Sequence, residues 1–105
     1  FVEQYVCQQL VVQGIKPRYW TNPNPQGRAE IDFVVEQGDE IFPIEVKSSS
    51  NIRAKSLAYV CSRYGLHGIR TGEIGYREQD WMTNIPLWCV DGLSAYLKRR
   101  IAKKE

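Results

Sequence analysis

The sequence predicts one α/β domain in which helices cover a mixed sheet. Segments with helical spacing and short strand-like segments follow each other in the order helix, strand, strand, strand, helix, strand. The 105 residues are enough for one compact core and too few for a second domain. Hydrophobic residues make up 43% of the chain and charged residues 25%, which is ordinary for a globular protein.

The first quarter of the chain predicts a helix followed by a short strand. Residues 1–13 carry apolar side chains at helical spacing, and Gly14 is a residue that favours helix ends. Residues 15–22 predict a strand with an edge-type proline, Pro17. Residues 22–27 (NPNPQG) consist of turn-forming residue types and predict a loop.

Two strand-like segments then surround a Gly-Asp pair. Residues 29–37 and 40–48 are rich in β-branched and aromatic side chains, and the dipeptide at 38–39 is typical of a two-residue turn. We therefore expect a β-hairpin.

The second half of the chain predicts a helix, a strand and a terminal helix. The first of these extends from about Ile52 to Tyr64, is capped by Ser50 or Asn51, and ends at Gly65. The later elements are a strand over 66–72, an apolar segment over 84–90, and a terminal helix over 91–104 capped by Asp91.

The predicted hairpin places two carboxylates opposite each other. A two-residue turn pairs Gln37 with Glu40, and the same register brings Asp32 opposite Glu45. Directly opposed residues share a face, with Cβ atoms about 4.5–5.5 Å apart. Lys47 lies two residues beyond Glu45 and shares that face.

Adjacent carboxylates repel each other, so this pair needs a compensating cation. One solution is an ordinary ion pair with Lys47. The other is Mg²⁺ or Mn²⁺, which would activate water and stabilise charge on a phosphoryl group while Lys47 positions that water or neutralises the phosphate. Glu3, at the edge of the buried face of the first helix, adds a third carboxylate.

The two solutions differ in what they predict for stability. If three carboxylates converge on one ammonium, Asp32→Asn or Glu45→Gln should raise the melting temperature, because repulsion is relieved. If the charges form ordinary ion pairs, the same substitutions should lower it.

The segments AEIDFVV and PIEVKSSS resemble the signature of PD-(D/E)XK nucleases, whose fold has a helix–three strands–helix–strand core. More closely, FVEQYV, EIDFVV, PIEVKSS, the following SL and the late NIPLW resemble a C-terminal domain of unknown function in bacterial and archaeal AAA-type ATPases. This resemblance covers nearly the whole chain. It implies a restriction-endonuclease-like fold over 1–105.

The resemblance also implies roles for individual residues. Asp32 and Glu45 would bind the metal ion, Lys47 would assist the chemistry, and Glu3 would match an acidic residue that many of these nucleases carry on the first helix. Ile31 stands where the signature has Pro.

Two functions therefore stay open. The first is a Mg²⁺-dependent nuclease-like domain that hydrolyses phosphodiesters of nucleic acid within an AAA-type ATPase. The second is a non-catalytic docking or regulatory module of such an ATPase that binds DNA or protein. The sequence lacks a Gly-rich phosphate loop, so we expect ATPase activity to reside in an N-terminal region absent from this chain. Phe1 opens the helical pattern without a capping residue, which suggests a fragment of a longer protein.

The remaining residues are weaker indicators. Cys7, Cys61 and Cys89 are odd in number and lack metal-ligand spacing, so we expect small core residues of a reducing, cytoplasmic compartment. The single histidine, His67, is expected to be structural rather than a general base. The tryptophans are expected in the core or at an interface rather than stacked on bases.

The net charge of +2 depends on the C-terminal end of the chain. Five of the 14 basic residues lie within 98–104, and residues 1–97 contain nine basic and eleven acidic residues. A strongly basic nucleic-acid-binding face is therefore not visible in the composition. We expect the basic tail to be a solvated, frayed terminus rather than a phosphate contact.

Overall fold

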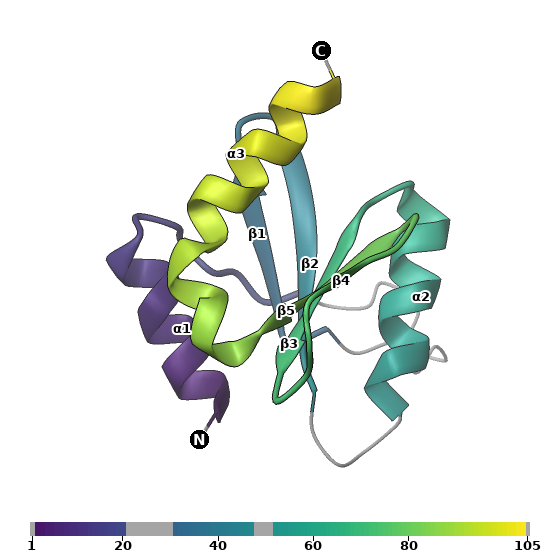
Figure 1. Cartoon of the computed structure of the whole chain (residues 1–105). Coiled ribbons are helices and arrows are strands. Elements are labelled where there is room, and N and C mark those ends of the chain that lie inside the picture. The colour runs from purple at the N-terminus through teal and green to yellow at the C-terminus, as the bar shows by residue number, and fades with distance from the viewer. Residues whose placement is uncertain (1, 21–30, 48–51, 105) are drawn as a thin grey trace.

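The computed structural model describes residues 2–20, 31–47 and 52–104. It confirms the α/β class: a mixed five-stranded sheet in the order β1-β2-β3-β5-β4 is flanked by helices (Figure 1). The elements are α1 (Val2–Val12), β1 (Phe33–Gln37), β2 (Glu40–Val46), α2 (Ile52–Tyr64), β3 (Gly68–Gly72), β4 (Arg77–Glu78), β5 (Met82–Pro86), the 3₁₀ helix η1 (Leu87–Gly92) and α3 (Leu93–Lys104). The loop predicted over 22–27 and the predicted caps Ser50 and Asn51 lie outside the described residues.

The sheet is parallel at its centre and antiparallel at its edges. Strand β2 pairs with β3 and β3 pairs with β5 in parallel, whereas β1 and β4 are antiparallel to their neighbours. Parallel neighbours need a crossover connection, which α2 provides between β2 and β3. The carboxyl ends of β2, β3 and β5 therefore meet at one edge of the sheet, where α/β proteins commonly bind their ligands.

Apolar side chains cover both faces of the sheet. Helices α1 and α3 lie on one face and α2 on the other (Figure 1). The larger cluster joins the sheet to α1, η1 and α3, and includes Leu10, Phe42, Ile44 and Leu97, all almost fully buried. The smaller cluster lies on the α2 side and consists of Ile31, Leu57, Val60, Cys61 and Met82.

The predicted hairpin is confirmed with its register. Gln37 pairs with Glu40 and Phe33 with Ile44, and Gly38 takes the positive φ of 62° that the turn requires. Pro43 is unusual in a strand with two neighbours, because proline has no N–H to donate. It is tolerated because the pairing of β2 with β3 begins only at Ile44.

Three expectations about other elements were incomplete or wrong. Residues 15–20 of the segment expected as a strand form only one antiparallel bridge, in which Arg18 and Val34 exchange both backbone hydrogen bonds. Strand β4 was not predicted. The apolar segment 84–90 is divided between the end of β5 and η1.

The start of α3 is stabilised by Gln13 and not by the predicted cap, Asp91. Asp91 lies in η1. The side-chain oxygen of Gln13 accepts a hydrogen bond from the backbone N–H of Ser94 at 2.8 Å, and its Nε2 donates to the backbone oxygen of Val90 at 2.7 Å. One amide therefore satisfies backbone groups at the junction of η1 and α3.

The basic C-terminal segment is part of the fold, so the expectation of a frayed terminus was wrong. Leu93 and Leu97 belong to the larger apolar cluster. Arg100 forms an ion pair with Glu78 at 2.9 Å, and Lys104 forms one with Glu40 at 2.8 Å. These contacts hold α3 against the edge strand β4 and against the start of β2.

The cysteines are free thiols, and only Cys61 is buried, whereas Cys89 is exposed. The expectation that all of them are core residues was therefore wrong for Cys89. Across the described ranges, no helix is both long and apolar enough to cross a membrane.

Candidate functional site

Glu45 is buried and paired with an arginine. The residue is 2% exposed, and its Oε2 lies 3.1 Å from Nε of Arg70. The two residues are direct neighbours in the parallel pairing of β2 with β3. The cation that compensates Glu45 is therefore Arg70, whereas the sequence suggested Lys47.

Asp32 lies directly before β1, at a bend in the chain. Its Oδ2 accepts a hydrogen bond from the backbone N–H of Val46 at 2.7 Å. The regular pairing of the hairpin stops at Phe33, so the carboxylate of Asp32 continues the ladder by one bond. Continuing the register places Asp32 opposite Glu45, as the sequence predicted.

Lys47 follows β2 at the carboxyl edge of the sheet, and it is exposed. Its backbone N–H donates to the backbone oxygen of Thr71 at 2.7 Å. A Cβ added at Gly72, which has a φ of +156°, would lie 3.2 Å from Cβ of Lys47. The close approach of these two segments therefore favours glycine at this position.

The fourth candidate, Glu3, is exposed on the first turn of α1. In the ranges 2–20, 31–47 and 52–104, no three acidic, histidine or cysteine residues form a group that could hold a metal ion. Asp32, Glu45 and Glu3 are thus not brought together as one such group.

The chemistry of Glu45 also fits a hydrated metal ion poorly. Mg²⁺ keeps several waters when it binds to a protein. The side chain of Glu45 is 3% exposed and already neutralised by Arg70. As arranged here, these residues do not fit a magnesium site.

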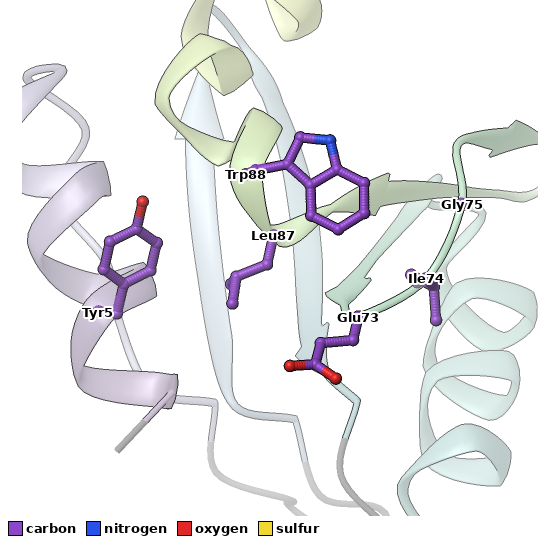
Figure 2. A pocket seen from close by; sticks show the side chains of 6 residues that line it. All are labelled: Tyr5, Glu73, Ile74, Gly75, Leu87 and Trp88. Atoms are coloured by element: carbon purple, nitrogen blue, oxygen red, sulfur yellow. The ribbon is translucent and has the colours of Figure 1, made fainter.

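A second feature at the carboxyl edge is an open pocket of about 590 Å³, which we call the edge pocket. Figure 2 shows Tyr5 on α1, Leu87 and Trp88 at the start of η1, and the loop after β3 around this pocket. The lining residues are Tyr5, Glu73, Ile74, Gly75, Leu87 and Trp88.

The edge pocket is mainly apolar and offers its aromatic side chains to solvent. Trp88 is 68% exposed and Tyr5 40% exposed. Among the described residues that line it, Glu73 is the single charged side chain. Exposed tryptophan and tyrosine next to aliphatic side chains are typical of protein interfaces.

The comparison with known proteins decides the family. Residues 1–90 match the family described as Domain of unknown function (DUF4143). The chain belongs to this family. No curated protein and no solved structure matches the sequence.

In this DUF4143 domain, His67 is part of the packed interior and not an accessible base. Its Nε2 lies 2.8 Å from Oγ1 of Thr83, and its Nδ1 lies 2.8 Å from a terminal nitrogen of Arg100. Burial, followed by the positive charge of Arg100, lowers the pKa of His67 from 6.5 to about 4. The imidazole is therefore neutral at pH 7.

The residue of the DUF4143 site that sequence reasoning missed is Arg70. Its only signal was a charged side chain inside the short strand-like segment 66–72. Charged side chains in buried strands need partners. Arg70 and Glu45 each lie in such a strand, so each of them predicts a partner of opposite charge.

Proposed function

We propose that this domain is a non-catalytic binding module, and the buried ion pair of Glu45 with Arg70 is the observation that carries the proposal. A catalytic carboxylate has to reach its metal ion, water or substrate. Glu45 is instead shielded from solvent and neutralised by a neighbouring strand. This arrangement is what a structural ion pair requires.

The binding surface in this proposal is the edge pocket, and the partner is a protein. Trp88 and Tyr5 supply large apolar contact areas that are open to solvent. Glu73 disfavours the phosphates of nucleic acid and favours a partner with a basic side chain. A segment with an aromatic or aliphatic side chain next to lysine or arginine fits both properties.

The resemblance of the sequence to the C-terminal domains of AAA-type ATPases suggests where such a module would act. In this proposal it is a docking or regulatory module of an ATPase.

A second candidate is a Mg²⁺-dependent phosphodiesterase of restriction-endonuclease-like fold. The observation that favours it is the hairpin register, which sets Asp32 opposite Glu45 and leaves Lys47 exposed at the end of the same strand. This candidate requires Arg70 to release Glu45.

A metal titration separates the two candidates. Isothermal titration of the domain with millimolar Mg²⁺ or Mn²⁺ is expected to give no saturable heat, because Glu45 is already paired with Arg70. The Glu45→Gln variant serves as the control and is expected to be equally silent. Saturable binding that Glu45→Gln abolishes, together with cleavage of an oligonucleotide, would overturn the binding-module proposal in favour of the phosphodiesterase.

The edge pocket is tested by selecting peptides on the immobilised domain from a displayed library. We expect enrichment of peptides with an aromatic or aliphatic side chain beside a basic residue. Trp88→Ala should weaken their binding by about 2 kcal/mol, as is usual for a central aromatic contact. Trp81→Ala is the matched control, since Trp81 is 37% exposed and does not line the pocket. Absence of enrichment, or equal loss in both variants, would contradict the assignment.

A further inference from the structure

The second half of α3 forms a pocket together with the region of β4. This pocket, which we call the basic pocket, has a volume of about 300 Å³ and lies outside the edge pocket. It is lined by Tyr76, Tyr96, Arg99, Arg100, Lys103 and Lys104, and Glu78 is the single acidic residue among the lining residues that the structure describes.

The lining has more positive than negative charge. Arg100 pairs with Glu78, and Lys104 pairs with Glu40. Arg99 and Lys103 have no ion-pair partner within the part of the chain that the structure describes. Two cations of the basic pocket are therefore available to an anion.

Arg100 is fixed in position by two partners. One terminal nitrogen donates to Oε1 of Glu78 at 2.9 Å, and the other donates to Nδ1 of His67 at 2.8 Å. Its Nε is buried and has no hydrogen-bond partner in the described residues. Because this nitrogen is shielded, a ligand in the pocket does not contact it, and the two bonds of the terminal nitrogens are what hold the guanidinium beside the pocket.

The side chains beneath the pocket form a closed ring of hydrogen bonds. Because arginine only donates, Nδ1 of His67 must accept, and Nε2 then donates to Thr83. The hydroxyl of Thr83 is left to donate to Tyr96 at 2.7 Å, and Tyr96 donates to Glu78 at 3.4 Å. This ring fixes the orientation of Arg100 and of the Tyr96 hydroxyl before any ligand arrives.

We propose that the basic pocket binds a phosphate group, as a small phosphorylated molecule or as part of a nucleic-acid backbone. Arginine and lysine recognise phosphate oxygens through charge-assisted hydrogen bonds. Arg99 and Lys103 supply the attracting charge, and Arg100 is held rigid beside them. The volume accommodates a phosphate group and the atoms next to it, which places this site at the small end of ligand pockets.

The test compares two double variants that remove the same charge. Arg99→Gln with Lys103→Gln changes the basic pocket, whereas Arg63→Gln with Lys98→Gln changes exposed residues outside its lining. Pyrophosphate and a short single-stranded oligonucleotide are titrated separately against the domain and both variants by calorimetry. All four substituted residues are exposed, and a thermal melt checks that each variant is folded.

We expect saturable binding of at least one probe, weakened about tenfold or more in the pocket variant and unchanged in the control variant. Tighter binding of pyrophosphate would identify a small phosphorylated molecule as the source. Tighter binding of the oligonucleotide, with a steep salt dependence, would identify a nucleic-acid backbone. The proposal is wrong if neither probe saturates at millimolar concentration, or if both variants lose affinity equally.

Discussion

Replacing Arg70 with Met is expected to destabilise the domain by about 3–5 kcal/mol, the cost of leaving one member of a buried ion pair uncompensated. Glu45 is 2% exposed, so its carboxylate cannot recover the lost contact from water. Glu45→Gln should cost less, because the Arg70 side chain is 18% exposed and glutamine still offers an acceptor to its Nε. Denaturation by urea at neutral pH measures both differences.

Two further variants make this result specific. Lys47→Met should change stability by less than about 0.5 kcal/mol, since Lys47 is exposed. The double variant Glu45→Gln with Arg70→Met should cost less than the sum of its parts, because neither charge is then left alone. If Glu45→Gln instead melts higher than the parent, repulsion between carboxylates dominates, and the metal-site interpretation of the sequence is favoured.

The domain is also expected to lose about 3 kcal/mol of stability between neutral and acidic pH through His67 alone, since each unit of pKa difference is worth about 1.4 kcal/mol. Burial and the nearby Arg100 lower the pKa of His67 from 6.5 to about 4. Between these values the unfolded chain binds more protons than the folded one, so acid favours unfolding. The contribution of His67 to the free energy of unfolding is fully present above pH 6.5 and is lost as the pH falls towards 4.

The comparison with His67→Gln isolates this contribution from that of the carboxylates, which also take up protons in acid. The amide of glutamine can accept from Arg100 and donate to Thr83, as the neutral imidazole does. The free energy of unfolding of this variant should fall less steeply between pH 6.5 and about 4 than that of the parent. Parallel curves for the two proteins would show that His67 titrates normally in the folded state.

The parts of the fold that the sequence predicted depend on neighbouring residues. The hairpin follows from alternating strand residues around Gly38-Asp39, and α2 follows from helical spacing ended by Gly65. The opposition of Asp32 and Glu45 is a consequence of that local turn. Such features can be derived from the sequence because the residues that determine them lie close together along the chain.

The parts that it did not predict depend on contacts between distant segments. Arg70 meets Glu45 only because β3 lies parallel to β2, a pairing that no local pattern specifies. Strand β5 contains the buried polar residue Thr83, which interrupts the apolar pattern that would identify β5 as a buried strand. The sequence-based description of the candidate metal site lacked Arg70 for the same reason, because this partner of the Glu45 carboxylate comes from another strand.

The Gln13 amide has a consequence for where the folding unit ends. Besides a bond to Gln9 in the preceding helix, the amide makes two hydrogen bonds to a distant segment: one to Val90, the last residue of the family match, and one to Ser94, which lies beyond it. A chain shortened to the matched region would retain one of these bonds and lose Leu93 and Leu97 from the larger apolar cluster. The segment that packs into one core therefore extends further along the chain than the segment that matches the family. A survey of relatives confined to the matched region would omit Arg99, Arg100, Lys103 and Lys104 of the basic pocket.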